Sequence, residues 1–345
     1  MSEDLAQKLI TVVIPAYNAQ DTIADTLRSV QSQSHQALEI LVVDDGSKDN
    51  TAAIVQQFAA ADPRIRLVSQ ANAGVAEARN NGWRQARSDL ISFVDADDLW
   101  SRDKIELQLA ALEAAGPRAG LVYSRYALID ENNRVTYLVH TPAPSGEVLD
   151  KLIVNNFVGN GSSALARREA IEAANGFEPA LFRAGAQGCE DILFYCRVAE
   201  HYEFAAVEDF QIGYRQLPGA MSANLPRMLR SWVMVNDEML ERHPAKKRII
   251  HESLRTYGNW TIRKAIGQRQ YADIMKLVGI AGSRSWSVAG IMLFYTVPQA
   301  VFRKLRWHVP GLRQLAARSE RKAAQPSKAS PEIRTQLAPG MLFNA

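Results

Sequence analysis

The sequence lacks both of the common glycine-rich nucleotide signatures. No Gly-x-Gly-x-x-Gly follows the first apolar run at residues 10–14, and the chain holds no Gly-Lys-Ser/Thr phosphate loop. Their absence excludes the usual dinucleotide-binding and P-loop classes. Any nucleotide that this chain binds must therefore be held by other groups.

Cysteine is scarce, and a signal peptide is not evident. Cys189 and Cys196 are the only cysteines, and they lie seven positions apart in a predicted helix, where disulfide geometry is poor. We expect reduced thiols, which fit the cytosol. The first ten residues, MSEDLAQKLI, have no apolar signal core. These features predict a cytoplasmic protein.

Long apolar runs are also rare. The stretch Trp286–Phe302 is mostly apolar, but its 17 residues are at the short limit for a membrane span and include Pro298. It can be a helix lying in a membrane interface, a buried core helix or a true span. Basic residues on both sides favour the interfacial interpretation, at the inner face of the cytoplasmic membrane.

The net charge of +3 conceals a strong asymmetry. Residues 241–345 hold 19 Lys or Arg against 5 Asp or Glu, whereas residues 1–240 hold 21 against 32. A basic C-terminal region can meet an anionic membrane surface, an anionic substrate or nucleic acid. We recognise no nucleic-acid-binding motif beside it, so no nucleic-acid partner is expected.

The first 115 residues alternate strand and helix signals. Four short apolar strands are predicted, each followed by a helical pattern, which is typical of a parallel sheet with helices on both faces. The strands are expected at residues 10–14, 39–43, 65–68 and 90–94, and the helices at 21–33, 50–60, 75–86 and 102–115.

The pattern changes from Gly120 onward. A hairpin is predicted around residues 131–133, then further short strands and helices, including closing strands at 204–207 and 211–214. Helical patterns run from about residue 224 to about 305. The proline-bearing polar tail after Arg318 is expected to be disordered.

Polar residues follow three of the predicted strands. Tyr17 comes after the first, Asp44 and Asp45 after the second, and the run 95–98 after the fourth. In open parallel sheets, ligands bind beyond the carboxyl ends of the strands. Because these ends share one edge, the side chains should converge on a single site.

Asp95, Asp97 and Asp98 form an acidic cluster within that run. Carboxylates packed at one strand end repel each other unless a cation or water neutralises them. Mg²⁺ or Mn²⁺ commonly bridges such carboxylates to substrate phosphates. The alternative is a capped helix start, with Asp98 as the cap.

Asp44 and Asp45 begin a second acidic turn. Their carboxylates can accept hydrogen bonds from a uracil-type base or a ribose hydroxyl. A solvated turn with Gly46 at positive φ is equally consistent with the sequence.

Tyr17, in the run Pro15-Ala16-Tyr17-Asn18, offers an aromatic face for a base, or it is a loop anchor. Arg79 can pair with phosphate or organise the acidic turns, or it is a surface arginine.

Four runs together carry a family resemblance. In order, they are TVVIPAYN at 11–18, VDDGS at 43–47 with Asp49 and Thr51, Gly74 with Ala78-Arg79-Asn80 and Gly82, and FVDADDLW at 93–100. The chain resembles family 2 of the inverting glycosyltransferases over about residues 9–222.

This resemblance implies a GT-A fold, an α/β architecture with a mostly parallel nucleotide-binding sheet and helices on both faces. Residues 1–118 would form the nucleotide-sugar half and 119–222 the acceptor half of a 1–222 domain. Residues 223–317 would be a helical region that associates with membranes, and 318–345 the disordered tail.

The resemblance also assigns roles to residues of the first half. Donor contacts fall on Pro15, Tyr17, Asn18, Asp44, Asp45, Arg79 and Asp95. Asp95 and Asp97 match the family's metal-binding Asp-x-Asp motif, and the adjacent Asp98 is a rival metal ligand.

The second half matches more loosely. Asn175-Gly176-Phe177-Glu178 resembles a family turn, and Glu190-Asp191 resembles the Glu-Asp motif that contains the catalytic base, which we assign to Asp191. By local evidence alone, this acidic pair can also be a helix N-terminus favoured by the dipole. Arg215 lies where a basic donor loop is expected, although the histidine that many members have shortly after it is absent here.

The sequence therefore predicts an inverting, metal-dependent glycosyltransferase of bacterial surface glycan synthesis. Its donor would be a nucleotide-sugar, a UDP-sugar above others, and its acceptor a glycan or lipid-linked hydroxyl. A nucleotidyltransferase is the enzymatic alternative, but it would usually show a Gly-rich basic loop where this chain has Pro15-Ala-Tyr-Asn18. A degenerate glycan-binding scaffold is the non-enzymatic alternative, and the intact acidic residues argue against it.

Overall fold

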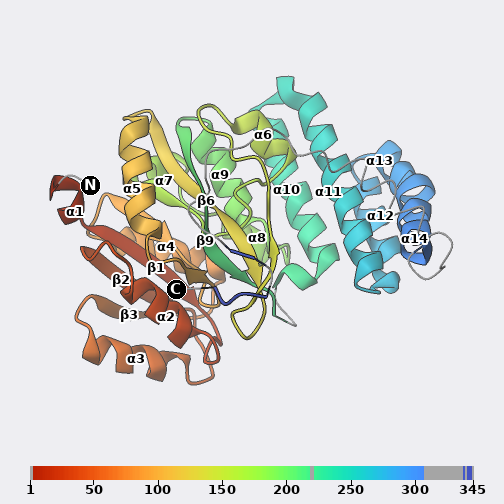
Figure 1. Cartoon of the computed structure of the whole chain (residues 1–345). Coiled ribbons are helices and arrows are strands. Elements are labelled where there is room, and N and C mark those ends of the chain that lie inside the picture. Colours follow the sequence, from red (N-terminus) through yellow and green to blue (C-terminus); the bar gives the residue numbers. More distant parts are fainter. Residues whose placement is uncertain (1–2, 218–220, 307–336, 339, 344–345) are drawn as a thin grey trace.

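The computed structural model of the chain describes residues 3–217, 221–306, 337–338 and 340–343. A single sheet forms its centre, with strand order β3-β2-β1-β4-β8-β6-β9-β5 and β7 paired to β6 (Figure 1). The strands are β1 (Ile10–Ala16), β2 (Leu38–Asp44), β3 (Ile65–Ser69), β4 (Leu90–Phe93), β5 (Leu99–Trp100), β6 (Ala119–Ile129), β7 (Val135–Leu138), β8 (Leu165–Arg167) and β9 (Glu203–Arg215).

The N-terminal half of the sheet is parallel, as predicted. Strands β3, β2, β1 and β4 run in one direction, while β8 is antiparallel to both β4 and β6. Because β8 reverses the direction, the second half is a mixed sheet, in which β6 pairs parallel to β9 and β5 antiparallel to it. This combination confirms the predicted α/β fold class.

Helices cover both faces because alternate strand residues point in opposite directions. Val13 of β1 belongs to a core with residues of α4 (Val75–Gln85) and α9 (Glu190–Ala199). Val12 and Ile14 belong to the opposite core, with α2 (Ile23–Gln31), α3 (Thr51–Ala61) and α5 (Lys104–Ala115). Short helices complete the parallel half and the mixed half of the sheet: α1 (Glu3–Gln7), α6 (Leu149–Val154), α7 (Arg168–Ala173) and α8 (Ala180–Arg183).

Glycine allows α4 to lie very close to β1. A Cβ at Gly82 would stand 2.3 Å from Cγ1 of Val13. This contact holds the N-terminal end of α4 near the carboxyl edge of the sheet, where the acidic loops lie.

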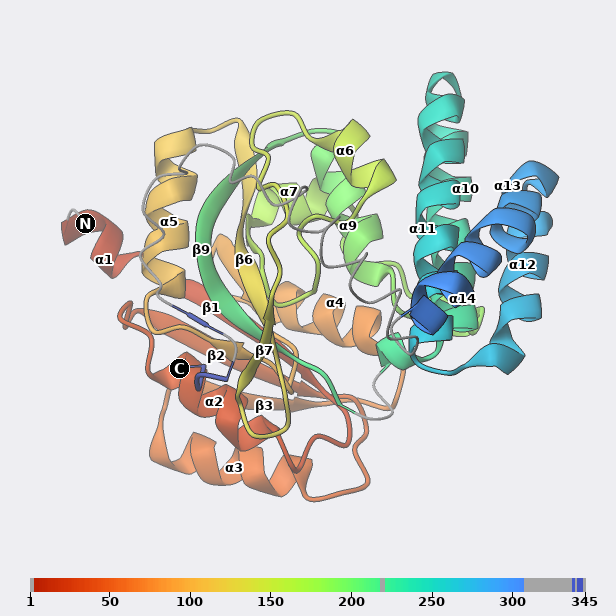
Figure 2. The ribbon, with the colours of Figure 1, turned by 45° about the vertical axis from the view of Figure 1, so that its right-hand side comes forward.

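The C-terminal helices stand beside the sheet rather than over its parallel half (Figure 2). They are α10 (Leu225–Arg242), α11 (Lys247–Gly267), α12 (Ile274–Gly282), α13 (Trp286–Ile291) and α14 (Val297–Arg306), and a π-helical turn at Met292–Thr296 joins the last two. They share a core of their own, and α10 and α11 also contact α9 and α6. The predicted helical region is confirmed as far as residue 306.

Local details differ from the predicted pattern. The two closing strands are one continuous strand, β9, and Leu99–Trp100 adds an unpredicted strand, β5. Pro298 does not end the helix, because the helical path continues from Trp286 to Arg306 through the π-helical turn that ends just before this proline. Within the described residues, no helix is both long and apolar enough to cross a membrane.

The tail departs from the expectation of disorder at its end. Residues 307–336 lie outside the described residues. Phe343, however, is buried against Leu99, Ile129 and Val135, and its N–H donates to the carbonyl of Asn133 at 2.8 Å. The segment 340–343 therefore packs on the β6–β7 hairpin.

Candidate active site

The predicted site residues meet at the carboxyl edge of β2, β1 and β4. Asp44 ends β2, the run from Tyr17 follows β1, and Asp95 follows β4, and these three strands are neighbours in the sheet. Topology alone therefore brings them together. Pro15 lies within β1 and is buried, so its ring shapes the strand end.

The loop after β1 is tied to the loop after β2. Asn18 adopts a left-handed φ of 48°, its N–H donates to Ser47 Oγ, and its Oδ1 accepts from the N–H of Lys48. Tyr17 is 49% exposed between them. Its ring is therefore free to take a base on its face.

Asp44 and Asp45 are both buried but hold different elements. Asp44 Oδ1 accepts from the N–H of Ser47 and closes its own turn. Asp45 accepts from the N–H groups of Ala73 and Gly74 at 2.8 and 2.9 Å, so it fixes the loop that leads into α4. Of the two carboxylates, Asp44 accepts fewer hydrogen bonds from the protein.

Arg79 joins α4 to the acidic cluster. Its Nη2 lies 2.5 Å from Oδ1 of Asp95, and its guanidinium lies over the ring of Phe177 at 5.1 Å. The arginine is 4% exposed, and its Nε has no hydrogen-bond partner among the described residues. Of the two functional roles proposed for it, the geometry shows the organisation of the acidic turn.

The three aspartates of the cluster have distinct environments. Asp95 and Asp97 are partly exposed, whereas Asp98 is fully buried. Asp98 accepts hydrogen bonds from Ser162 Oγ at 2.5 Å and from the N–H of Arg215 at 2.9 Å. Asp98 therefore links β4, β9 and the 156–163 segment, while Asp95 and Asp97 remain the better placed to meet a ligand.

Charge is crowded in this cluster. Burial, followed by the Asp95 carboxylate, raises the pKa of Asp97 to about 6. Burial together with Asp97 and Asp95 raises the pKa of Asp98 well above its usual value. A cation placed here would relieve that repulsion.

The described residues contain no ready cluster of three or more Asp, Glu, His or Cys for a metal. Two carboxylates suffice for Mg²⁺ or Mn²⁺ when substrate phosphates complete the coordination. Asp95 and Asp97 offer those oxygens, so the donor set fits a metal that arrives with a diphosphate.

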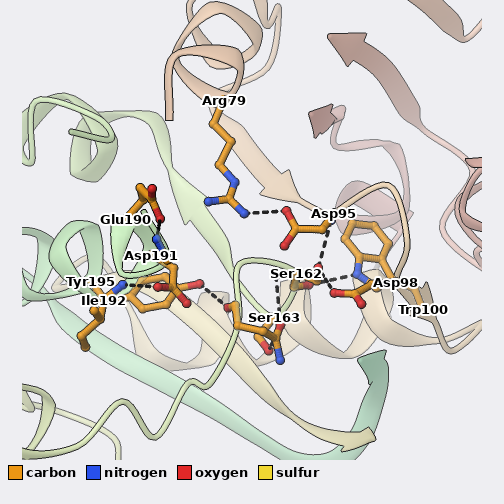
Figure 3. Close-up of polar contacts among 12 residues, drawn as sticks. Arg79, Asp95, Asp98, Trp100, Ser162, Ser163, Glu190, Asp191, Ile192 and Tyr195 are labelled. Carbon is orange, nitrogen blue, oxygen red and sulfur yellow. Dashed lines mark hydrogen bonds and ion pairs between the residues drawn. The ribbon is translucent and has the colours of Figure 1, made fainter. Parts of the chain in front are cut away.

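Glu190 and Asp191 begin α9 and face Arg79 from the side opposite Asp95 (Figure 3). Glu190 Oε2 accepts from the N–H of Gly188, and the glutamate is almost fully buried. Asp191 Oδ1 accepts from the N–H of Ile192 at 2.7 Å. Burial raises the pKa of Asp191, although the charge of Arg79 opposes this rise.

Arg215 is committed to the protein on most sides. Its Nε donates to the carbonyl of Asp97 at 2.6 Å and its Nη1 to Oδ1 of Asn133 at 2.5 Å. Its Nη2 is buried and has no partner within the described part of the chain. That one N–H₂ group is a buried donor left without an acceptor there.

The sequence reasoning gave no role to the segment 156–163. Asn156 Nδ2 donates to Oδ2 of Asp191 at 3.3 Å, and the hydroxyl of Tyr195 donates to the carbonyl of Asn160 at 2.8 Å. Ser162 Oγ also accepts from the N–H of Asp95 at 2.9 Å. The Gly- and Ser-rich run GNGSS at 159–163, just before β8, was the available signal.

The fold and the site together define a class. The parallel half of the sheet is joined to a mixed half, and acidic loops lie at the carboxyl edge of the parallel strands. This is the GT-A arrangement. Residues 11–174 match the model of the family described as "Glycosyl transferase family 2". Residues 11–174 thus form a family 2 glycosyltransferase domain, as the motifs predicted.

Curated relatives agree with this assignment. The chain is 35% identical over 153 residues to TuaG of Bacillus subtilis, a glycosyltransferase named for teichuronic acid biosynthesis. It is 35% identical over 152 residues to WfgD of Escherichia coli, named as a UDP-Glc:alpha-D-GlcNAc-diphosphoundecaprenol beta-1,3-glucosyltransferase. Each match covers 44% of this chain, and it spans less than two thirds of the relative, 59% and 57% respectively.

Solved structures share the fold. Residues 1–349 of S. aureus TarS, in complex with UDP-GlcNAc, superpose with a TM-score of 0.60 at 18% identity, covering 79% of each chain. The mannosyltransferase PcManGT from Pyrobaculum calidifontis, in complex with GDP-Man and Mn²⁺, gives a TM-score of 0.55 at 20% identity, covering 91% of this chain and 87% of the other.

Proposed function

We propose that this chain transfers a sugar from a nucleotide-diphosphate-sugar, a UDP-sugar above others, to an acceptor hydroxyl with inversion of configuration. The observation that carries the proposal is the arrangement around Arg79, with the Asp95 cluster on one side and Asp191 on the other. A direct displacement needs the leaving diphosphate and the base on opposite faces of the sugar.

The donor side is supported by unsatisfied groups. Arg79 Nε and Arg215 Nη2 are buried donors without partners among the described residues, and an anionic diphosphate would satisfy them. Mg²⁺ or Mn²⁺ at Asp95 and Asp97 would neutralise charge on the diphosphate as it leaves. Tyr17 and Asp44 stand where the base and ribose would lie.

The acceptor side rests on Asp191. In the proposed step, Asp191 takes the proton of the acceptor hydroxyl while the oxygen of that hydroxyl bonds to the anomeric carbon. The bond from that carbon to the diphosphate breaks, and the nucleoside diphosphate leaves with the electron pair. Burial keeps the pKa of Asp191 above that of an ordinary aspartate, which strengthens it as a base.

A donor panel tests this function. We expect the wild-type protein to release nucleoside diphosphate from at least one nucleotide-sugar, and to do so only with Mn²⁺ or Mg²⁺ present. Turnover of nucleotide triphosphates with release of pyrophosphate would favour the nucleotidyltransferase instead. Glycan binding without turnover of any donor would favour the scaffold.

The relatives' names support a place in bacterial surface glycan synthesis, with a glycan or lipid-linked acceptor. Large side chains exposed on the last helices suit an anionic lipid surface. Trp286 is 86% exposed, Phe294 81% and Phe302 60%, and exposed Arg303 follows them. We propose that residues 286–306 lie on the inner face of the cytoplasmic membrane, with no nucleic-acid partner.

Vesicle flotation tests the membrane proposal. The full chain should bind vesicles that contain phosphatidylglycerol at low salt, and Trp286→Ser with Phe294→Ser should weaken that binding several-fold. Tyr137→Ser, which removes a 59% exposed aromatic from the sheet half, is the matched control and should bind like the wild type. Equal binding by all three proteins would contradict the proposal.

A further inference from the structure

The segment Asn156–Ser163 contacts both acidic parts of the candidate site. Asn156 contacts Asp191 at one end, and Ser162 contacts Asp95 and Asp98 at the other. Between them, Gly161 lies so close to Arg79 that a Cβ there would stand 2.1 Å from Nη2. One short stretch of chain thus touches Asp191, Arg79 and the acidic cluster.

Hydrogen bonds within the segment hold each of its two ends in place. Asn160 Oδ1 accepts from the N–H of Ser162 at 3.0 Å and from Ser163 Oγ at 3.0 Å. Asn156 Oδ1 accepts from the N–H of Gly159 at 2.9 Å. The hydroxyl of Tyr195, on the same helix as Asp191, donates to the carbonyl of Asn160.

We propose that Asn156–Ser163 is the positioning element of the site, in which Asn156 orients the carboxylate of Asp191 and Ser162 orients Asp95 and Asp98. The inference rests on the proposed function of those carboxylates. Neither Asn156 nor Ser162 is a catalytic residue in this account, because each acts through an aspartate.

Asn156 has a specific job at its end. The amide group of Asn156 donates to one oxygen of Asp191 while the N–H of Ile192 donates to the other, so both carboxylate oxygens are held. A hydrogen bond to the charged form of a carboxyl group lowers its pKa. Removing the amide of Asn156 should raise the pKa of Asp191 further and leave the carboxylate free to rotate.

Ser162 has a different job. Its hydroxyl donates to Asp98 and accepts from the main chain of Asp95, and its carbonyl accepts from Trp100 Nε1 at 3.0 Å. It therefore fixes the turn 95–98 without contacting Asp191. Removing the hydroxyl should disturb the acidic turn and leave the pKa of Asp191 unchanged.

Other titratable groups act on Asp191 and must stay constant in the comparison. Those whose charges couple with it come from α4, the turn after β4, β6, the start and body of α9, and α11. They are Arg79, Asp95, Tyr126, Cys189, Glu190, Tyr195, Cys196 and Tyr257. None of them is changed in the variants below.

The test compares two variants by two readouts that need no turnover. The first readout is the pKa of Asp191 from ¹³C-aspartate NMR, assigned with Asp191→Asn, and the second is calorimetric binding of UDP with Mn²⁺. Asn156→Ala should raise the pKa of Asp191 and change UDP binding less than about twofold. Ser162→Ala should weaken UDP binding about tenfold or more and leave the pKa of Asp191 in place.

Neighbouring residues supply matched controls. Asn155 is exposed and hydrogen-bonds through its backbone. Ser163 is as buried as Ser162, but its hydroxyl bonds only within the segment. Asn155→Ala should leave the pKa of Asp191 as in the wild type, and Ser163→Ala should leave UDP binding as in the wild type. Asn156→Leu adds no charge beside Asp191, and Ser162→Cys keeps the side-chain size, so these variants repeat the test if an alanine variant fails to fold.

An unchanged pKa of Asp191 in both Asn156 variants would overturn the proposal, and so would equal effects of Ser162→Ala and Ser163→Ala. Donor turnover then separates the two levels of the account. If the selective shifts occur but wild-type protein turns over no donor, the proposed function fails and the positioning element stands. If turnover occurs without those shifts, the positioning element fails and the proposed function stands.

Discussion

Arg79 Nη2 lies 2.5 Å from Asp95 Oδ1, and this ion pair ties the helix after β3 to the acidic turn after β4. The pair is half of a larger brace, because the guanidinium also lies over Phe177, whose N–H and carbonyl are both bound by the amide of Asn80. Two adjacent residues of α4 thus hold the acidic turn and the turn at 175–177.

Breaking that pair should destabilise the fold and impair the site together. Arg79→Met leaves Asp95 without its partner, and we expect a loss of about 2–4 kcal/mol, below the full cost of a buried pair because Asp95 is partly exposed. UDP binding should weaken as the acidic turn loosens. Denaturant unfolding and calorimetry measure the two effects.

Arg84→Met is the control on the same helix. It removes a pair with Glu77 in which both partners are solvent-accessible, so it should cost less than about 1 kcal/mol and leave UDP binding unchanged. Similar losses in the two variants would show that Arg79 has no special role.

Gly176 tests the second half of the brace. It has a φ of +64°, and a Cβ there would stand 2.5 Å from Oδ1 of Asn80. Gly185 has nearly the same φ, +62°, with nothing within 4 Å of its Cβ position. Gly185→Ala should cost about 1–2 kcal/mol from backbone strain alone, and Gly176→Ala should cost clearly more by thermal or denaturant unfolding. Equal costs would mean that the Asn80 contact yields freely.

Metal-dependent binding should fall at mildly acidic pH. The pKa of Asp97 is raised to about 6, and a metal ligand must be deprotonated. Below that pH, Asp97 carries a proton in the metal-free protein, so Mn²⁺-dependent binding of UDP should weaken as the pH falls through about 6. Calorimetry across that range measures it.

Asp97→Ala should abolish the metal dependence and its pH profile together. Asp89→Ala, which removes an almost fully exposed carboxylate, should leave both as in the wild type. Metal-dependent UDP binding that survives in Asp97→Ala would place the metal on other ligands.

The sequence was sufficient to predict the parallel half of the sheet and the edge at which its acidic loops meet. Short apolar runs that alternate with helical patterns predict the parallel strands. The ends of those strands predict where Tyr17, Asp44 and Asp95 meet. Both predictions depend only on local sequence patterns. The strand β5 could not be predicted, since two residues, Leu99 and Trp100, carry too little periodicity and depend on pairing with β9.

The positions that sequence reasoning missed depend on long-range contacts. Asn156 and Asp191 are 35 residues apart, and Ser162 and Asp98 are 64 apart, so no local pattern connects them. Phe343 shows the same limit, because the composition of the tail predicts disorder while a pocket formed by β6 and β7 receives its ring. Tertiary packing decides all three cases.

The most direct test of the central claim is Asp191→Asn, assayed for both transfer and UDP binding. Asparagine keeps the size of the side chain but cannot accept the proton, so we expect transfer to fall by about 10²–10⁴-fold while UDP binding with Mn²⁺ stays within about twofold. Glu190→Gln, at the neighbouring residue, should lose less transfer. Normal transfer by Asp191→Asn would contradict the account and place the base elsewhere.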